Sequence, residues 1–150
     1  MLAIRKMKYD DLYRVSDIEK KIFSSPWSYN SFREIIKYEY NHYFAIVKNN
    51  EIIGYFGMQI IIDECQIHNI GILEEERGKG YGKRAFEFII DYCNDIGINN
   101  ITLEVRQGNV EAIGLYEKYG FKKMSKIKDY YKNPVEDGFL MRLDLGERFE

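Results

Sequence analysis

The sequence predicts a mixed α/β fold: a central, mostly antiparallel sheet that contains one parallel strand pair and is flanked by about four helices. Three observations lead to this fold class. Residues 42–62 alternate like an antiparallel hairpin, residues 65–105 follow the order strand, helix, strand, and helical periodicity precedes and follows these segments. A strand–helix–strand unit implies a right-handed crossover, so the strands at 65–73 and 101–105 should lie parallel in one mixed sheet.

The N-terminal segment predicts two helices before the sheet. The first should begin near Asp10 and end before Pro26. Its inner face consists of Leu12, Val15, Ile18 and Ile22. Ser28 can cap the second helix. The inner face of that helix consists of Phe32, Ile35 and Ile36.

The remaining elements alternate between strands and helices. Residues 42–48 and 51–62 should pair across a turn at Asn49 and Asn50, because asparagine tolerates the left-handed backbone of hairpin turns. Asp63 and Glu64 should form the next turn, which leads into the strand at 65–73. A helix at 83–96, a strand at 101–105, a helix at 109–119 and a last strand at 139–145 complete the order.

Composition and charge exclude several classes of protein. The 150 residues, 45% hydrophobic and 31% charged, suit one globular domain over 1–150. A net charge of -2 gives no basic field for nucleic acid, and the longest apolar run, 58–62, is too short to cross a membrane. Charged residues near the start interrupt any signal-peptide segment, so we expect a cytoplasmic protein. We also expect a monomer or weak dimer. Two cysteines and two histidines without metal-ligand spacing predict neither a disulfide scaffold nor a metal site.

The most informative segment is Arg77-Gly78-Lys79-Gly80-Tyr81-Gly82. It follows the apolar run Ile70-Gly71-Ile72-Leu73 and opens a helix. Backbone N–H groups at a helix start are unpaired, and the helix dipole favours negative charge there. Glycines let the backbone approach a phosphate because they have no Cβ. The segment therefore predicts a phosphorylated cofactor.

This loop resembles the R-x-x-G-x-G acetyl-CoA motif of the GNAT family of N-acetyltransferases. The resemblance covers almost the whole chain and points to one branch, the ribosomal-protein-alanine N-acetyltransferases. The other segments that carry it are Pro26-Trp27-Ser28, Leu103-Glu104-Val105-Arg106, Asn109, Leu115-Tyr116-Glu117, Gly120-Phe121, Tyr130-Tyr131 and Glu136-Asp137. The chain departs from the family pattern at Gly108, where a small side chain is more usual before the asparagine.

The resemblance implies acetyl-CoA as the cosubstrate. Ile70, Gly71 and Ile72 would pair through their backbone with the pantetheine arm, because the family's sheet splays after this strand and the arm adds like an extra strand. Asn109 would contact the cofactor arm, although it is also a good helix N-cap. The pyrophosphate would be held by Arg77, Gly78, Lys79, Gly80, Tyr81, Gly82 and Lys83.

By the same resemblance, Glu104 is the general base and Tyr116 the general acid. The chemistry needs such a pair, because an amine must be neutral to attack a thioester and the departing thiolate must gain a proton. A phenol stays protonated at neutral pH. A backbone N–H of the strand that ends at Ile72 could bind the developing oxyanion. By strand geometry alone, Glu104 could instead pair with Arg106 on the same strand face.

The implied acceptor is the N-terminal alanine of a small-subunit ribosomal protein. The acceptor cleft would be lined by Trp27, Tyr130, Tyr131, Glu136 and Asp137. Aromatic side chains suit an extended peptide, and the two carboxylates would attract a positively charged amine terminus. Within the same family, another protein N-terminus, a lysine or a small amine is the alternative acceptor.

Two other classes of protein share parts of this pattern. A dinucleotide-binding module would use Gly78 and Gly80 with Glu104 as its distal acid, but Lys83 stands at the third glycine position and the preceding meander does not fit. A catalytically silent binding module of the GNAT type is the other alternative. It has no chemical need for the pair Glu104 and Tyr116.

Overall fold

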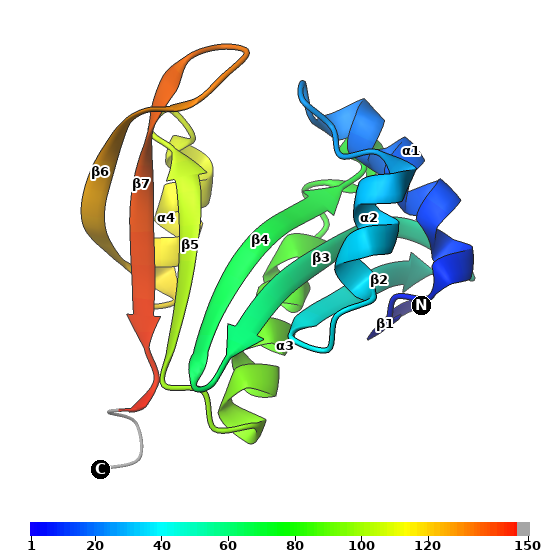
Figure 1. The fold of residues 1–150 in the computed structure, drawn as a ribbon, viewed down its shortest axis with the longest axis horizontal. Helices are drawn as coiled ribbons and strands as arrows, with labels where there is room; N and C mark the ends of the chain where they lie inside the picture. Colours follow the sequence, from blue (N-terminus) through cyan, green and yellow to red (C-terminus); the bar gives the residue numbers. More distant parts are fainter. Residues whose placement is uncertain (147–150) are drawn as a thin grey trace.

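One seven-stranded sheet runs through the computed structural model, which describes residues 1–146 (Figure 1). The last four residues of the predicted domain lie outside the described part. The strand order is β1-β2-β3-β4-β5-β7-β6, and neighbours are antiparallel apart from β4 and β5. This agrees with the predicted fold class. The strands are β1 (Leu2–Lys6), β2 (Asn41–Lys48), β3 (Glu51–Ile61), β4 (Glu64–Ile72), β5 (Asn100–Arg106), β6 (Lys122–Tyr131) and β7 (Glu136–Asp144).

Four α-helices within residues 1–146 cover the two faces of the sheet: α1 (Leu12–Ile22), α2 (Tyr29–Ile36), α3 (Tyr81–Asp95) and α4 (Val110–Lys118). Helices α1 and α2 lie on one face of the β1–β4 half, and α3 lies on the opposite face (Figure 1). Each face has its own buried cluster. The first cluster includes Leu12, Val15, Ile18, Phe32, Tyr43 and Tyr55, and the second includes Phe44, Phe56, Phe86, Ile89, Ile101 and Met141.

The predicted helices and the meander are confirmed, with small shifts at their ends. Asn49 and Asn50 both have positive φ, 51° and 69°, as the hairpin turn requires. Ser28 caps α2, because its Oγ accepts a hydrogen bond from the Ser31 N–H at 3.1 Å. The next turn is wrong by one residue: Ile62 and Asp63 form it, and β4 already begins at Glu64.

Two strands, β1 and β6, are missing from the sequence prediction. Both lie at the edges of the sheet. Charged residues make up half of β6, which is exposed along most of its length, so it shows no alternation of buried and exposed side chains. The last strand accordingly begins earlier than predicted, at Glu136 rather than residue 139. Together β6 and β7 form a long hairpin.

Strands β4 and β5 are paired only at their N-terminal ends. Their register joins Glu64 to Asn100, Cys65 to Ile101 and Gln66 to Thr102, and beyond this point the strands diverge (Figure 1). On its other side β4 stays paired with β3 as far as Ile72. The C-terminal half of β4 therefore has one edge without a strand partner.

Gly57 provides a test of the packing between β2 and β3. An ideal Cβ on Gly57 would lie 2.1–2.5 Å from three ring atoms of the buried Tyr43. We expect Gly57→Ala to lower the free energy of unfolding by about 1–3 kcal/mol, because the ring and backbone must shift. Gly114→Ala in α4 is the control: nothing lies within 4 Å of its Cβ, so helix propensity should stabilise the chain by about 0.5–1 kcal/mol. Urea unfolding measures both changes, and an undiminished stability of Gly57→Ala would contradict the packing described.

Candidate active site

The free edge of β4 presents backbone groups of Ile70 and Ile72. The Leu73 N–H donates to the Ile53 carbonyl of β3 at 3.0 Å, and Gly71 lies opposite Tyr55. Because successive residues of a strand direct their backbone groups to opposite sides, those of Ile70 and Ile72 point away from β3 and toward the diverging β5. An extended ligand with amide groups can add to the sheet at such an edge.

A β-bulge lies in β4 close to the point where β4 begins to diverge from β5. Met58 of β3 is paired with Ile67 and Gly57 with Asn69, so His68 is the extra residue. The His68 Nδ1 lies 3.0 Å from the Tyr43 hydroxyl, and burial lowers the pKa of His68 despite the opposing effect of Glu104. His68 therefore faces the α1–α2 side of the sheet, on the same side as Glu104.

The glycine loop ends at the N-terminus of α3. Gly78 and Gly80 have positive φ, 77° and 83°, and an ideal Cβ on either would meet nothing within 4 Å. The carbonyl of Gly80 accepts the Arg84 N–H at 3.1 Å, so the preceding N–H groups of the first turn have no partner within the helix. Helix α3 begins at Tyr81, two residues earlier than the predicted start at residue 83. Loop and helix start therefore fit a phosphate-bearing ligand.

The basic side chains of this loop are bound to the chain itself. Arg77 Nε donates to the Ile72 carbonyl at 3.1 Å, which ties the loop to the end of β4. Lys79 and Lys48 both pair with Glu76, at 3.2 and 2.9 Å. Glu76 thus anchors two lysines beside the start of α3.

Glu104 lies on β5 two residues beyond Thr102, the last residue paired with β4. Its Oε1 accepts a hydrogen bond from Gln66 Nε2 of β4 at 3.2 Å. Glu104 also lies beside the Tyr130 hydroxyl, and hydrogen bonding to the carboxylate, with burial, raises the pKa of Tyr130 to about 12. Arg106 pairs with Glu136 instead of Glu104, at 3.2 Å. The half-buried Glu104 carboxylate is therefore positioned by neutral partners.

Tyr116 lies on α4 and is largely buried against aromatic rings. Its ring centroid is 5.0 Å from that of Phe86 and 6.1 Å from that of Phe121. Burial raises the pKa of Tyr116, so its phenol keeps its proton at neutral pH. Asn109 caps the same helix, because its Oδ1 accepts the Ala112 N–H at 3.2 Å. Its predicted contact with the cofactor arm stays a prediction.

The predicted acceptor residues come from the α1–α2 loop and the β6–β7 hairpin. Trp27 is half-buried and packs on Phe32, with its ring centroid 5.5 Å from that of Phe32. Tyr130 and Tyr131 meet edge to face, with centroids 5.0 Å apart. The structure thus brings aromatic side chains from two distant segments to the α1–α2 side of the diverging strands.

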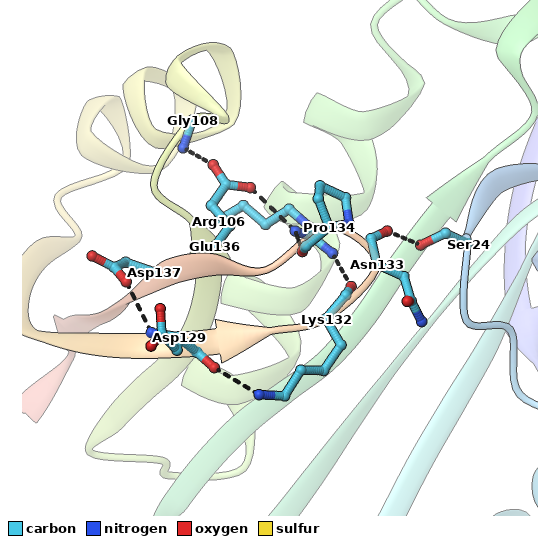
Figure 2. Close-up of polar contacts among 9 residues, drawn as sticks. All are labelled: Ser24, Arg106, Gly108, Asp129, Lys132, Asn133, Pro134, Glu136 and Asp137. Atoms are coloured by element: carbon cyan, nitrogen blue, oxygen red, sulfur yellow. Dashed lines mark hydrogen bonds and ion pairs between the residues drawn. The ribbon is translucent and has the colours of Figure 1, made fainter.

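Glu136 and Asp137 are bound within the hairpin. Glu136 accepts hydrogen bonds from the Gly108 N–H at 2.7 Å and from Arg106 at 3.2 Å (Figure 2). Asp137 accepts the Asp129 N–H at 2.8 Å. An approaching amine would meet carboxylates that already have partners, and the attraction predicted for them stays a prediction.

Glu19 is a site residue that the sequence prediction missed. It is 3% exposed and accepts hydrogen bonds from the Trp27 N–H at 3.0 Å, the Asn69 side chain at 3.5 Å and the Tyr55 hydroxyl. One carboxylate therefore joins α1, the α1–α2 loop, β3 and the bulge of β4. The available signal was its position four residues after Val15, on the buried face of the helix.

The chain belongs to the GNAT family of acetyltransferases, because residues 12–121 match the Acetyltransferase (GNAT) family. A Bacillus subtilis (strain 168) protein is 36% identical to it over 97% of each chain. The [ribosomal protein bS18]-alanine N-acetyltransferase of Escherichia coli (strain K12) is 30% identical, over 92% of this chain and 91% of its own.

Solved structures agree with this assignment. The crystal structure of the ribosomal-protein-S18-alanine N-acetyltransferase from Escherichia coli superposes with a TM-score of 0.91, at 29% identity, over 96% of this chain and 94% of its own. Arabidopsis thaliana NAA60 in complex with acetyl-CoA has the same fold, with a TM-score of 0.86 at 19% identity over 97% and 100% of the two chains. In residues 1–146 no helix is long and apolar enough to cross a membrane, and no group of three or more His, Cys, Asp or Glu could hold a metal ion.

Burial of Glu19 predicts a specific pH dependence of stability. Burial raises its pKa above the ordinary 4.5, so the folded chain holds this proton more tightly than the unfolded chain. The free energy of unfolding should therefore fall, relative to Glu19→Gln, as pH rises from 4.5 through the raised pKa. Urea unfolding of both proteins across this range measures the difference. Asp17→Asn, an exposed carboxylate on the same helix, is the control; an equal trend there would assign the effect to net charge rather than to burial.

Proposed function

We propose that this chain transfers the acetyl group of acetyl-CoA to the N-terminal α-amine of a protein, with the N-terminal alanine of a small-subunit ribosomal protein as acceptor. The position of Glu104 carries the proposal: a half-buried carboxylate, held by Gln66 at 3.2 Å, where β4 and β5 diverge. The named activity of the Escherichia coli relative supports the same acceptor. A ribosomal-protein acceptor would place the reaction in the cytoplasm. We propose no nucleic-acid or membrane partner, and a chain that acts as a monomer or weak dimer.

Acetyl-CoA supplies the reactive thioester. Ile70 and Ile72 hold its pantetheine arm through their backbone groups on the free edge of β4, and Gly71 between them stays paired with Tyr55 of β3. The pyrophosphate binds the loop 77–83, whose positive-φ glycines and unpaired N–H groups fit a phosphate. Asn109 adds a contact to the arm at the start of α4.

The acid–base steps need one proton acceptor and one proton donor. Glu104 takes the proton from the acceptor ammonium, and the neutral amine attacks the thioester carbonyl. As the C–S bond breaks, the phenol of Tyr116 gives its proton to the departing sulfur, and the second proton that the attacking nitrogen loses restores the phenol. At pH 7, neutralising an α-amine costs roughly 1–1.4 kcal/mol, against about 4.6 for lysine. One carboxylate therefore suffices for an N-terminal amine.

The acceptor peptide lies between the α1–α2 loop and the β6–β7 hairpin. Trp27, Tyr130 and Tyr131 form aromatic walls for an extended chain end. Glu136 and Asp137 add negative charge for the amine terminus or for basic residues that follow it.

Removal of the base should slow the reaction at neutral pH. We expect Glu104→Gln to lower kcat/KM by about 10²–10⁴, because the carboxylate no longer accepts the amine proton. The loss should shrink as pH rises past the pKa of the acceptor amine, since the amine then arrives neutral. Glu51→Gln, an exposed carboxylate on β3, is the control. Steady-state kinetics from pH 6.5 to 9 tests this, and a loss that is constant across the range would remove Glu104 as the base.

A peptide panel tests the acceptor. The peptides differ only at the first residue, and one is N-terminally blocked with an internal lysine. Alanine should lead, because each added methylene in a tight pocket changes discrimination by ~1–3 kcal/mol, and the blocked peptide should be inert. Mass spectrometry of the products identifies the modified amine. Efficient acetylation of the blocked peptide would assign the chain to lysine acceptors instead.

A further inference from the structure

The guanidinium of Arg106 holds the tip of the β6–β7 hairpin, residues 132–135. Its Nη1 donates to the Pro134 carbonyl at 3.0 Å and to Glu136 at 3.2 Å, and its Nη2 donates to the Lys132 carbonyl at 3.0 Å (Figure 2). The same group lies 4.5 Å from the centroid of the Tyr131 ring. Arg106 thus contacts the residues before the turn, Tyr131 and Lys132, and those after it, Pro134 and Glu136.

The tip held in this way reaches the α1–α2 loop. Ser24 Oγ donates to the Asn133 carbonyl at 2.9 Å, and Asn133 Nδ2 donates to Ser25 Oγ at 3.1 Å (Figure 2 shows the first of these). The two loops are more than 100 residues apart in the sequence. The two hydrogen bonds therefore join the two segments that the proposed function assigns to the acceptor walls.

We propose that Arg106 is a positioning residue that sets acceptor selectivity: by fixing the hairpin tip against Ser24 and Ser25, it limits the acceptor space to a slender chain end with a small first residue. This inference rests on the proposed function. Arginine suits the task because its planar fork places donors on separate nitrogens that bind two carbonyls and a carboxylate at once, whereas the donors of lysine all diverge from one nitrogen. A surface ion pair alone has little effect on geometry, so the bonds to the two carbonyls are the decisive contacts.

Arg106 and Glu104 form hydrogen bonds with different partners. The Glu104 carboxylate is bonded to Gln66 of β4, and the guanidinium is bonded to the hairpin. A variant that keeps the positive charge and removes the fork therefore separates positioning from electrostatics.

The test compares Arg106→Lys with wild type on peptides that begin with alanine or leucine. We expect KM for the alanine peptide to rise about tenfold with kcat within about threefold, and the alanine-to-leucine ratio of kcat/KM to fall about tenfold. KM for acetyl-CoA should not change. Trypsin cleavage after the exposed Lys132 should become faster, which measures opening of the tip without catalysis.

Two further variants complete the experiment. Ser24→Ala removes a contact between the tip and the α1–α2 loop and should lower the same ratio, with the double variant no worse than Arg106→Lys because both contacts act through the position of the same tip. Arg5→Lys is the matched control: Arg5 also binds a carboxylate as a fork, to Asp11 at 2.8 and 3.0 Å, but on β1 at the opposite edge of the sheet. We expect it to leave the ratio unchanged.

The outcomes separate this inference from the proposed function. Faster cleavage after Lys132 with an unchanged alanine-to-leucine ratio would overturn the inference while the proposed function stands. The same conclusion follows if Arg5→Lys lowers the ratio as much as Arg106→Lys. A wild-type protein that acetylates no peptide would overturn both, a result visible before any variant is compared.

Discussion

The end of hydrogen bonding between β4 and β5 is the constraint on which the site depends. The strands pair only at Glu64–Gln66, so every later backbone group on that edge of β4 must find another partner or remain open to a ligand. The divergence also leaves space beside Glu104, which lies two residues beyond the last β5 residue paired with β4, while Gln66 ties that carboxylate back to β4. A sheet paired along its full length would fill this space with its own strand. The proposed acceptor and cofactor sites thus meet at one break in the sheet.

Rigid anchors surround this break. On the α1–α2 side, the buried carboxylate of Glu19 holds together the Trp27 backbone and Asn69, the residue after the bulge. On the hairpin side, Arg106 holds the tip that reaches Ser24. Both anchors use charged groups whose partners come from distant segments, and a buried or half-buried charge with several hydrogen bonds fixes geometry more firmly than apolar contact does. The segments proposed as acceptor walls, the α1–α2 loop and the end of the β6–β7 hairpin, are therefore held by the scaffold.

The sequence predicted those parts whose signal is local. The glycine loop, the N-cap at Ser28 and the turn at Asn49 and Asn50 follow from backbone preferences of single residues, and the structure confirms the local geometry of each. Strand β6 gave no signal because its exposed, lysine-rich sequence lacks alternation. For Arg106, strand geometry offered the nearby Glu104 as a partner, but its actual partners, Lys132, Pro134 and Glu136, are about 30 residues away. Contacts of this kind depend on the hairpin's path, which a local pattern does not encode.

Amide hydrogen exchange measured by NMR tests most directly the claim that the free edge of β4 receives the cofactor. In the free protein, the N–H groups of Ile70 and Ile72 should exchange faster than that of Leu73, which is bonded to β3 at 3.0 Å. Saturating acetyl-CoA without acceptor should slow exchange at Ile70 or Ile72 while Leu73 changes little. Protection confined to the start of α3, with both isoleucines unchanged, would contradict the account.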